Sequence, residues 1–288
     1  MIDIAAQYRW RWRPALQRGA YRAAYAVARV LLWPLPGRMR LALRQAAAVV
    51  APLDYRGGGL RLHVESLLEY DKRARSCAKE PETVAWIERN VRPGDVVFDI
   101  GANVGAYALV AARFTAGRAR VFAFEPGCAN FAQLCRNIVL NDCGASVVPL
   151  ALALSDHTGF DVFHYRSLDS GAALHTLGAD AARAVFDQPL PCYRLDDLVE
   201  RFGLPQPNHI KLDVDGIEHA VLQGAERTLK DPALRTVLVE TDDGRSGSER
   251  ITATLAAAGL RLASTHPHHD NPLHRGPVVR NCVYVREG

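Results

Sequence analysis

The sequence contains neither paired cysteines nor a long uninterrupted apolar run. Its six cysteines are scattered without a C-x-x-C pair, which excludes a paired-cysteine zinc site or a dithiol redox motif and indicates reduced structural thiols. The longest apolar run near the N-terminus, residues 23–36, is interrupted by Arg29, Pro34 and Pro36 and is shorter than the roughly 20 residues that a bilayer span requires. Arg residues also run through this segment, and no small-residue cleavage site ends it. We therefore predict neither a transmembrane helix nor a signal peptide, and we expect a cytoplasmic protein.

Acidic residues are scarce in the first 50 residues, which contain nine Arg, no Lys and a single acid, Asp3. This segment carries a formal charge of +8, whereas the rest of the 288-residue chain, with 26 basic and 30 acidic residues, carries −4. The formal net charge of +4 therefore describes neither part of the chain.

The basic segment has the pattern of helices interrupted near residues 33–37, where two prolines and a glycine lie close together. Three of the four Trp residues also fall in it. Arg stems and indole rings suit a membrane interface, but a helical extension that packs on the main domain or on a second subunit is the simpler interpretation. We predict a basic helical extension over residues 1–55. Peripheral contact with the inner face of a membrane through residues 1–50 and homo-oligomer formation stay open, and we expect no nucleic-acid binding.

From about residue 80, short apolar runs alternate with helical stretches. The strands that we expect are 96–100, 121–124, 146–150, 209–213 and 236–240, with an additional strand over 160–165 and a hairpin near 60–65. The expected helices are 80–88, 105–114, 127–141, 192–202 and 217–230. This alternation predicts an α/β fold of the Rossmann-like class, with a mostly parallel central sheet and helices on both faces. Ligands of such sheets bind at the carboxyl ends of the strands, which directs the search for a site.

A glycine-rich turn follows the first apolar strand and reads D-I-G-A-N-V-G. The candidate cofactor-binding residues of this turn are Asp99, Gly101, Ala102, Asn103 and Gly105. The two glycines allow a sharp turn and a close approach of the backbone to a ligand. The G-x-G-x-x-G spacing of dinucleotide-binding proteins is absent, which disfavours an oxidoreductase.

An acid also ends the second strand, at Glu125-Pro126, 20 residues beyond the second glycine of the turn. A carboxylate at this position can accept hydrogen bonds from both ribose hydroxyls. A ribose-binding acid without a phosphate-binding turn favours a nucleoside-type cofactor such as S-adenosylmethionine over NAD. After the third strand, Ala153 can contact an adenine ring while Ser155 or Asp156 meets its polar edge, although a plain turn would have the same sequence.

Five motifs in this order resemble those of the FkbM family of methyltransferases. They comprise residues 99–107, 125–126, 153–156, 194–198 and 210–218, the last followed by 221–225. The resemblance covers roughly residues 79–285, within a domain that we assign to 56–288. One departure from the family pattern is Asp215, where the family usually carries Glu. The carboxylate is kept, but the side chain of Asp is one carbon shorter than that of Glu.

The resemblance implies a class I methyltransferase fold and O-methylation, from S-adenosylmethionine, of a hydroxyl on a sugar, a polysaccharide precursor, a polyketide or a related metabolite. Two alternatives stay open. One is N-methylation of an amino sugar or peptide, and the other is a non-catalytic cofactor-binding subunit of a biosynthetic assembly.

Methyl transfer requires an acceptor oxygen close to the methyl carbon and a group that takes the acceptor's proton. Asp213, Asp215 and Glu240 at the ends of the fourth and fifth strands are candidates, Asp213 first because a buried carboxylate is otherwise costly. These acids could instead hold Mg²⁺, which we do not favour. His266 in a His-rich loop is a further candidate base, because the pKa of His lies near neutrality, although such a loop is more often simply exposed.

Overall fold

The computed structural model describes residues 13–173, 175–178, 184–242, 248–267 and 279–287. The chain divides into two units, residues 1–48 and 49–288. Strand β1 (Val49–Pro52) pairs antiparallel with β2 (Arg61–Val64) and so belongs to the second unit. The division therefore lies before the predicted boundary at residue 55, and the predicted hairpin near residues 60–65 has its first strand farther upstream.

The first unit contains two helices, α1 (Arg13–Leu32) and α2 (Gly37–Ala46), joined by a turn over residues 33–36. The interruption that the sequence predicts is thus confirmed, and Pro36 is the residue that precedes α2. Within the part of the chain that the structure describes, no helix has both the length and the apolar character needed to cross a membrane.

The second unit is built on a seven-stranded sheet with the strand order β12-β13-β11-β10-β3-β4-β5. Five of its strands are mutually parallel and confirm the five predicted ones: β3 (Val96–Ile100), β4 (Arg120–Phe124), β5 (Val147–Leu150), β10 (His209–Leu212) and β11 (Thr236–Asp242). Strand β13 (Val279–Arg286) runs antiparallel to both of its neighbours, β11 and β12 (Leu260–Pro267), which makes the sheet mixed.

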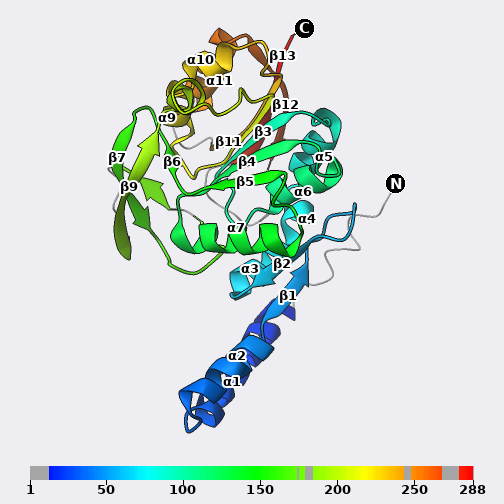
Figure 1. Cartoon of the computed structure of the whole chain (residues 1–288), viewed down its shortest axis with the longest axis vertical. Helices are drawn as coiled ribbons and strands as arrows, with labels where there is room; N and C mark the ends of the chain where they lie inside the picture. The colour runs from blue at the N-terminus through cyan, green and yellow to red at the C-terminus, as the bar shows by residue number, and fades with distance from the viewer. Residues whose placement is uncertain (1–12, 174, 179–183, 243–247, 268–278, 288) are drawn as a thin grey trace. The chain divides into compact units, whose positions relative to one another are not determined.

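Helices cover both faces of this sheet (Figure 1). One face carries α5 (Pro81–Asn90), α6 (Ala106–Phe114) and α7 (Cys128–Leu140). The other carries α8 (Leu195–Glu200), α9 (Glu218–Gln223), α10 (Glu226–Lys230) and α11 (Ser248–Ala257). Three short elements, α3 (Leu67–Asp71), the 3₁₀ helix η2 (Arg73–Arg75) and α4 (Ser76–Lys79), precede α5.

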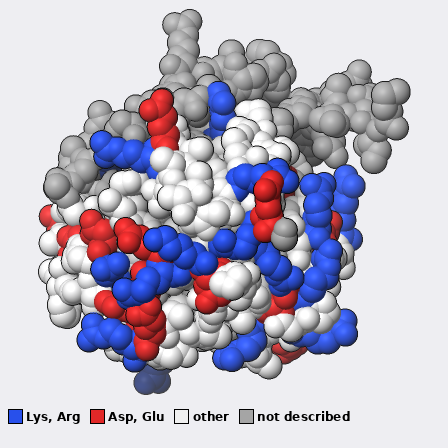
Figure 2. Space-filling model, turned by 90° about the horizontal axis from the view of Figure 1, so that it is seen from above, with Lys and Arg blue, Asp and Glu red and all other residues white. Residues whose placement is uncertain are grey.

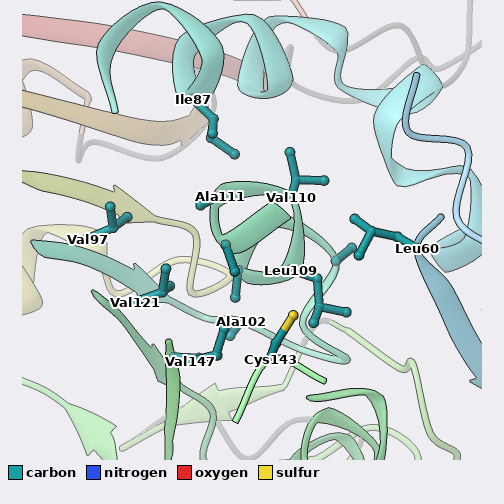
Figure 3. Packing of buried hydrophobic residues seen from close by; sticks show 14 of the residues in the cluster. Leu60, Ile87, Val97, Ala102, Leu109, Val110, Ala111, Val121, Cys143 and Val147 are labelled. Carbon is teal, nitrogen blue, oxygen red and sulfur yellow. The ribbon is translucent and has the colours of Figure 1, made fainter. Parts of the chain in front are cut away.

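Alternation along the strands divides the core into two layers, because successive side chains of a strand point to opposite faces. Val97 and Val121 belong to the layer under α5 and α6, whereas Phe98 and Ile100 belong to the layer under α9 to α11. Figure 3 shows side chains of the first layer, with Val97, Val121 and Val147 from neighbouring strands and Leu109, Val110 and Ala111 from α6. Asp99 shares the face of Val97, which brings this acid to the α5 and α6 side.

Two predicted helices differ in the structure. The helix expected over 192–202 begins at Leu195, because Cys192 and Tyr193 end strand β9 (Phe186–Tyr193). The helix expected over 217–230 is divided into α9 and α10 at Gly224. A Cβ atom on Gly224 would lie 2.0 Å from the backbone oxygen of Ser155, so the close approach of these two segments requires glycine.

A second sheet of four strands has the order β6-β9-β7-β8. The additional strand expected over 160–165 is confirmed as β7 (Gly159–Tyr165), which pairs antiparallel with β9 and β8 (Thr176–Leu177), while the two-residue β6 (Ala153–Leu154) pairs with the end of β9. Pro189 and Pro191 lie within β9. Because proline is uncommon within sheets, the sequence pattern does not indicate this strand.

Candidate active site

The point at which the strand order of the central sheet reverses lies between β3 and β10. From β3 the chain continues to β4 and β5 on one side, and it later crosses to β10 and β11 on the other side. The loops after β3 and β10 therefore diverge and leave a crevice at the carboxyl ends of these strands, the usual position of ligands in open α/β sheets. A cavity of about 530 Å³ lies there, within the range of roughly 300–1,000 Å³ that is typical of small-molecule sites.

The cavity brings most of the predicted site residues together. Those that line it are Gly101, Ala102, Asn103, Glu125, Pro126, Ala153, Asp213, Asp215 and Glu240. Because β4 and β10 flank β3 on opposite sides, Glu125 and Pro126 approach the cavity from one side and Asp213 and Asp215 from the other. The two groups of residues, far apart in the sequence, therefore face one binding space.

The turn after β3 packs directly against the end of β10. Gly101 has a φ of +83°, and a Cβ atom added to it would lie 1.8 Å from the backbone oxygen of Asp213. Asn103, with a φ of +50°, donates from its side chain to the backbone oxygen of Ala172 at 2.8 Å. Gly105 does not line the described cavity, since it precedes α6, and a Cβ there would meet Leu134 of α7 at 2.5 Å.

Glu125 is buried at the cavity wall, with 5% of its surface exposed. Its two carboxylate oxygens accept hydrogen bonds from the backbone amides of Asn103 and Gly127, both at 2.8 Å. Burial raises the pKa of Glu125 to about 7, although these hydrogen bonds act in the opposite direction. An ionised carboxylate has about four acceptor positions, so Glu125 can still accept from a ligand hydroxyl beside these amides and the Asn130 side chain.

The three acids on the other side form a compact cluster. One carboxylate oxygen from each of Asp213, Asp215 and Glu240 lies within 4.8 Å of the others. Burial, followed by the charges of Asp213, Asp215 and Glu80, raises the pKa of Glu240 to about 10. Glu240 therefore retains its proton at neutral pH, as expected where carboxylates are crowded in a site of low polarity.

A buried lysine connects this cluster with the acid of the glycine turn. The Nζ atom of Lys211, on β10, lies 3.1 Å from Asp213 Oδ2 and 3.8 Å from Asp99 Oδ1. Burial lowers the pKa of Lys211, but the charges of Asp213, Asp99 and Glu80 together raise it above its ordinary value. The same Nζ atom lies 5.2 Å from the centre of the Tyr107 ring, a cation–π contact.

Asp99 lies behind the cavity wall rather than in its described lining. It is buried, and burial raises its pKa while Lys211 opposes the rise. Its Oδ1 atom accepts no hydrogen bond from the residues that the structure describes, so the Lys211 ammonium is its main compensation. Asp99 therefore lies behind Lys211, and of these two residues only Lys211 belongs to the described lining of the cavity.

Three other predicted residues do not belong to the described lining of the cavity. Ser155 donates to Asp156 at 3.3 Å, and Asp156 in turn pairs with the ring of His157 at 2.9 Å, beside the second sheet. The sequence predicts a loop at His266, but the residue lies on strand β12, where its ring contacts Ser264 at 3.0 Å. It is two strands away from Glu240, because both residues are in register with Asn281. The other histidines of that loop, at positions 268 and 269, lie outside the described residues.

Sequence reasoning missed five charged residues of the cavity lining: Lys72, Arg73, Lys79, Glu80 and Lys211. For Lys211 the signal was a lysine within β10, two residues before the acid that follows the strand. Glu80 precedes Pro81, the first residue of α5. An acid at this position stabilises the start of a helix, so the sequence gives no reason to assign Glu80 to a binding site. In the structure Glu80 is 4% exposed and accepts a hydrogen bond from Lys79.

The chain is similar to several known proteins. A family model described as the methyltransferase FkbM domain matches residues 99–268. The chain is 28% identical over 228 residues to the hexuronic acid methyltransferase AglP of Haloferax volcanii, covering 78% of this chain and 89% of that protein. It is 29% identical over 220 residues to the 31-O-demethyl-FK506 methyltransferase FkbM of Streptomyces tacrolimicus, covering 68% and 82%. Among solved structures, the methyltransferase FkbM of Methylobacillus flagellatus is 17% identical, with a TM-score of 0.47, covering 68% of this chain and 44% of that one.

Proposed function

The chain belongs to the FkbM family of methyltransferases, and from this premise we propose that it transfers a methyl group from S-adenosylmethionine to a hydroxyl oxygen of a sugar or polyketide. The names of its relatives support this acceptor class, since one is a methyltransferase of a hexuronic acid and another of 31-O-demethyl-FK506. The observation that carries the proposal is the cavity at the switch point, which has Glu125 on one side and the three-acid cluster on the other.

The lining of the cavity fits such a cofactor. Glu125 is a buried acceptor suited to ribose hydroxyls, and the apolar side chains of Phe124, Leu152 and Leu154 offer contacts for an adenine ring. The turn at Gly101 leaves the backbone free of side-chain bulk beside the acidic cluster. When bound, the cofactor supplies the methyl group as an electrophile carried on a sulfonium.

Within the acidic cluster, Asp213 is the residue that best fits the role of proton acceptor. Burial and the neighbouring carboxylates raise the pKa of Glu240 and favour its protonated form, which disfavours Glu240 as the base. Asp213 lines the cavity and forms an ion pair with Lys211, and a neighbouring ammonium favours the ionised form of a carboxylate. Proton acceptance by a positioned side chain contributes typically about 10²- to 10⁴-fold to a rate.

The spacing of the three carboxylates also fits a divalent cation, which is the second candidate role for this cluster. We favour the metal-independent role, because Lys211 already compensates Asp213 and the raised pKa of Glu240 keeps that group neutral. A cation would have to displace that proton and compete with Lys211.

The proposed function predicts methyl transfer to a hydroxylated acceptor. Purified protein is incubated with S-adenosylmethionine that is radiolabelled in its methyl group, together with a uronic acid glycoside, a neutral sugar, a macrolide alcohol or an amino sugar. We expect label on an oxygen of one of the first three, with turnover unchanged by EDTA and by added Mg²⁺.

The other outcomes of this experiment are equally informative. Label on the nitrogen of the amino sugar would favour an N-methyltransferase. Calorimetric binding of the cofactor without turnover on any acceptor would favour a non-catalytic subunit. Loss of turnover in EDTA that Mg²⁺ restores would assign the acidic cluster to a cation, and absence of cofactor binding would contradict the proposal.

The raised pKa of Glu125 predicts that cofactor affinity depends on pH. Only the ionised carboxylate accepts both ribose hydroxyls, and with a pKa of about 7 its ionised fraction rises about tenfold between pH 6 and pH 8. We therefore expect the Kd for S-adenosylmethionine to fall by up to about tenfold over this interval, measured by calorimetry. Glu125→Gln should bind more weakly and should lose this part of the pH dependence. Parallel pH profiles for the two proteins would contradict the assignment of Glu125 to the ribose.

A further inference from the structure

Helix α1 of the N-terminal unit has two chemically different sides. Arg22 and Arg29 are seven residues apart and fall on the same side of the helix. Val27, Val30 and Leu31 fall on the other side and are 57%, 74% and 67% exposed. This is the pattern of an amphipathic helix, but its apolar side is not buried.

Helix α2 repeats this arrangement over a shorter length. Arg40 and Arg44 lie one turn apart on one side, and Met39 and Leu43 lie one turn apart on another. Met39 is 52% exposed, Leu43 is 44% exposed, and α2 contains no buried residue. Trp33, in the turn between the two helices, is 77% exposed.

Apolar side chains that are exposed in a contiguous set normally mark an interaction surface. Within residues 19–48, every described residue is exposed or half-buried. An ordinary surface helix of a globular domain would bury the apolar side that α1 and α2 display. The exposed apolar sides of α1 and α2 are therefore the expected contact surface for a binding partner.

The charge of the unit identifies the kind of partner. Residues 13–48 contain seven Arg and no acidic residue. On the face of the molecule shown in Figure 2, by contrast, Lys and Arg side chains lie among Asp and Glu side chains. A second copy of this chain would bring two strongly positive units together, which is unfavourable, and a nucleic acid would leave the apolar sides uncovered.

We propose that α1 and α2 dock the protein on the surface of an anionic lipid bilayer. The apolar sides and Trp33 enter the boundary between headgroups and acyl chains, and the guanidinium groups contact lipid phosphates. The helices lie on the membrane and do not cross it, consistent with the interrupting arginines and prolines. This inference concerns the first unit alone and does not depend on the proposed methyltransferase chemistry.

The test measures sedimentation of the full chain with vesicles of phosphatidylcholine alone and of phosphatidylcholine mixed with phosphatidylglycerol. We expect binding to the mixed vesicles only, weakening as salt is raised. A variant with Arg22, Arg29, Arg40 and Arg44 all changed to Gln keeps the helix propensity and should bind at least about tenfold more weakly. A second variant, Val27→Ser with Val30→Ser and Leu43→Ser, should also lose affinity.

The matched control changes four exposed arginines of the second unit to Gln, at positions 56, 61, 89 and 250, and so lowers the net charge of the chain equally. It should bind the mixed vesicles as the unchanged protein does. Equal loss in this control, equal binding to neutral vesicles, or unchanged binding of the Arg variant in α1 and α2 would each overturn the proposal. Equilibrium sedimentation showing an oligomer that the apolar variant disperses would assign the surface to self-association instead.

Discussion

Replacing Asp213 by Asn is expected to lower kcat by about 10²- to 10⁴-fold while leaving the affinity for S-adenosylmethionine nearly unchanged. The substitution keeps the shape of the side chain and its contact distance to Lys211, but the amide cannot accept the acceptor's proton. Lys211 retains Asp99 as a partner, so the buried ammonium is not left without a compensating charge. Single-turnover methyl transfer measures the rate, and calorimetry measures cofactor binding.

The neighbouring acid provides a matched control. Asp215 belongs to the same cluster and has a φ of +60°, a conformation that Asn tolerates well. Asp215→Asn therefore removes one charge from the cluster without straining the backbone, and we expect its effect on kcat to be less than about tenfold. If the Asp215 variant is the more impaired of the two, Asp215 is the base. If neither is impaired, proton acceptance does not occur in this cluster.

The central sheet could be predicted from the sequence because its parallel strands are buried on both faces. Such strands are short and mostly apolar runs, as at Val96–Ile100 and Arg120–Phe124. The four-stranded sheet lacks this signal. Its strand β9 contains Pro189 and Pro191, and β6 has only two residues. The sequences of both strands therefore cannot be distinguished from those of loops.

The candidate site could be predicted wherever a residue's role follows from its position at a strand's end. Glu125 and Asp213 directly follow β4 and β10, and the shared edge of a parallel sheet brings them to one cavity. Ser155 shows the limit of this reasoning. Ala153 and Leu154 of β6 line the cavity, but the backbone of Ser155 packs against Gly224 and the residue lies outside the described lining. Such a contact between segments about 70 residues apart is not revealed by local pattern.

The close contact between the glycine turn and β10 predicts the largest structural effect. In Gly101→Ala the new Cβ would be placed 1.8 Å from the backbone oxygen of Asp213, and backbone atoms of two central strands cannot move aside without separating β3 from β10. The φ of +83° adds strain of roughly 1–2 kcal/mol. We expect a loss of about 2–5 kcal/mol in the free energy of unfolding, since overpacking adds roughly 1–3 kcal/mol to this strain.

Gly94→Ala separates the two contributions to this loss. Gly94 has a φ of +91°, and no atom lies within 4 Å of a Cβ built on it, so this variant carries the backbone strain without the contact. Urea unfolding of the full chain, followed by far-ultraviolet circular dichroism, should show Gly94→Ala destabilised by about 1–2 kcal/mol and Gly101→Ala by clearly more. Soluble Gly94→Ala beside insoluble Gly101→Ala would be the extreme form of the same result. Equal losses in the two variants would mean that backbone strain alone requires glycine at position 101, and that the approach of β10 does not shape the cofactor turn.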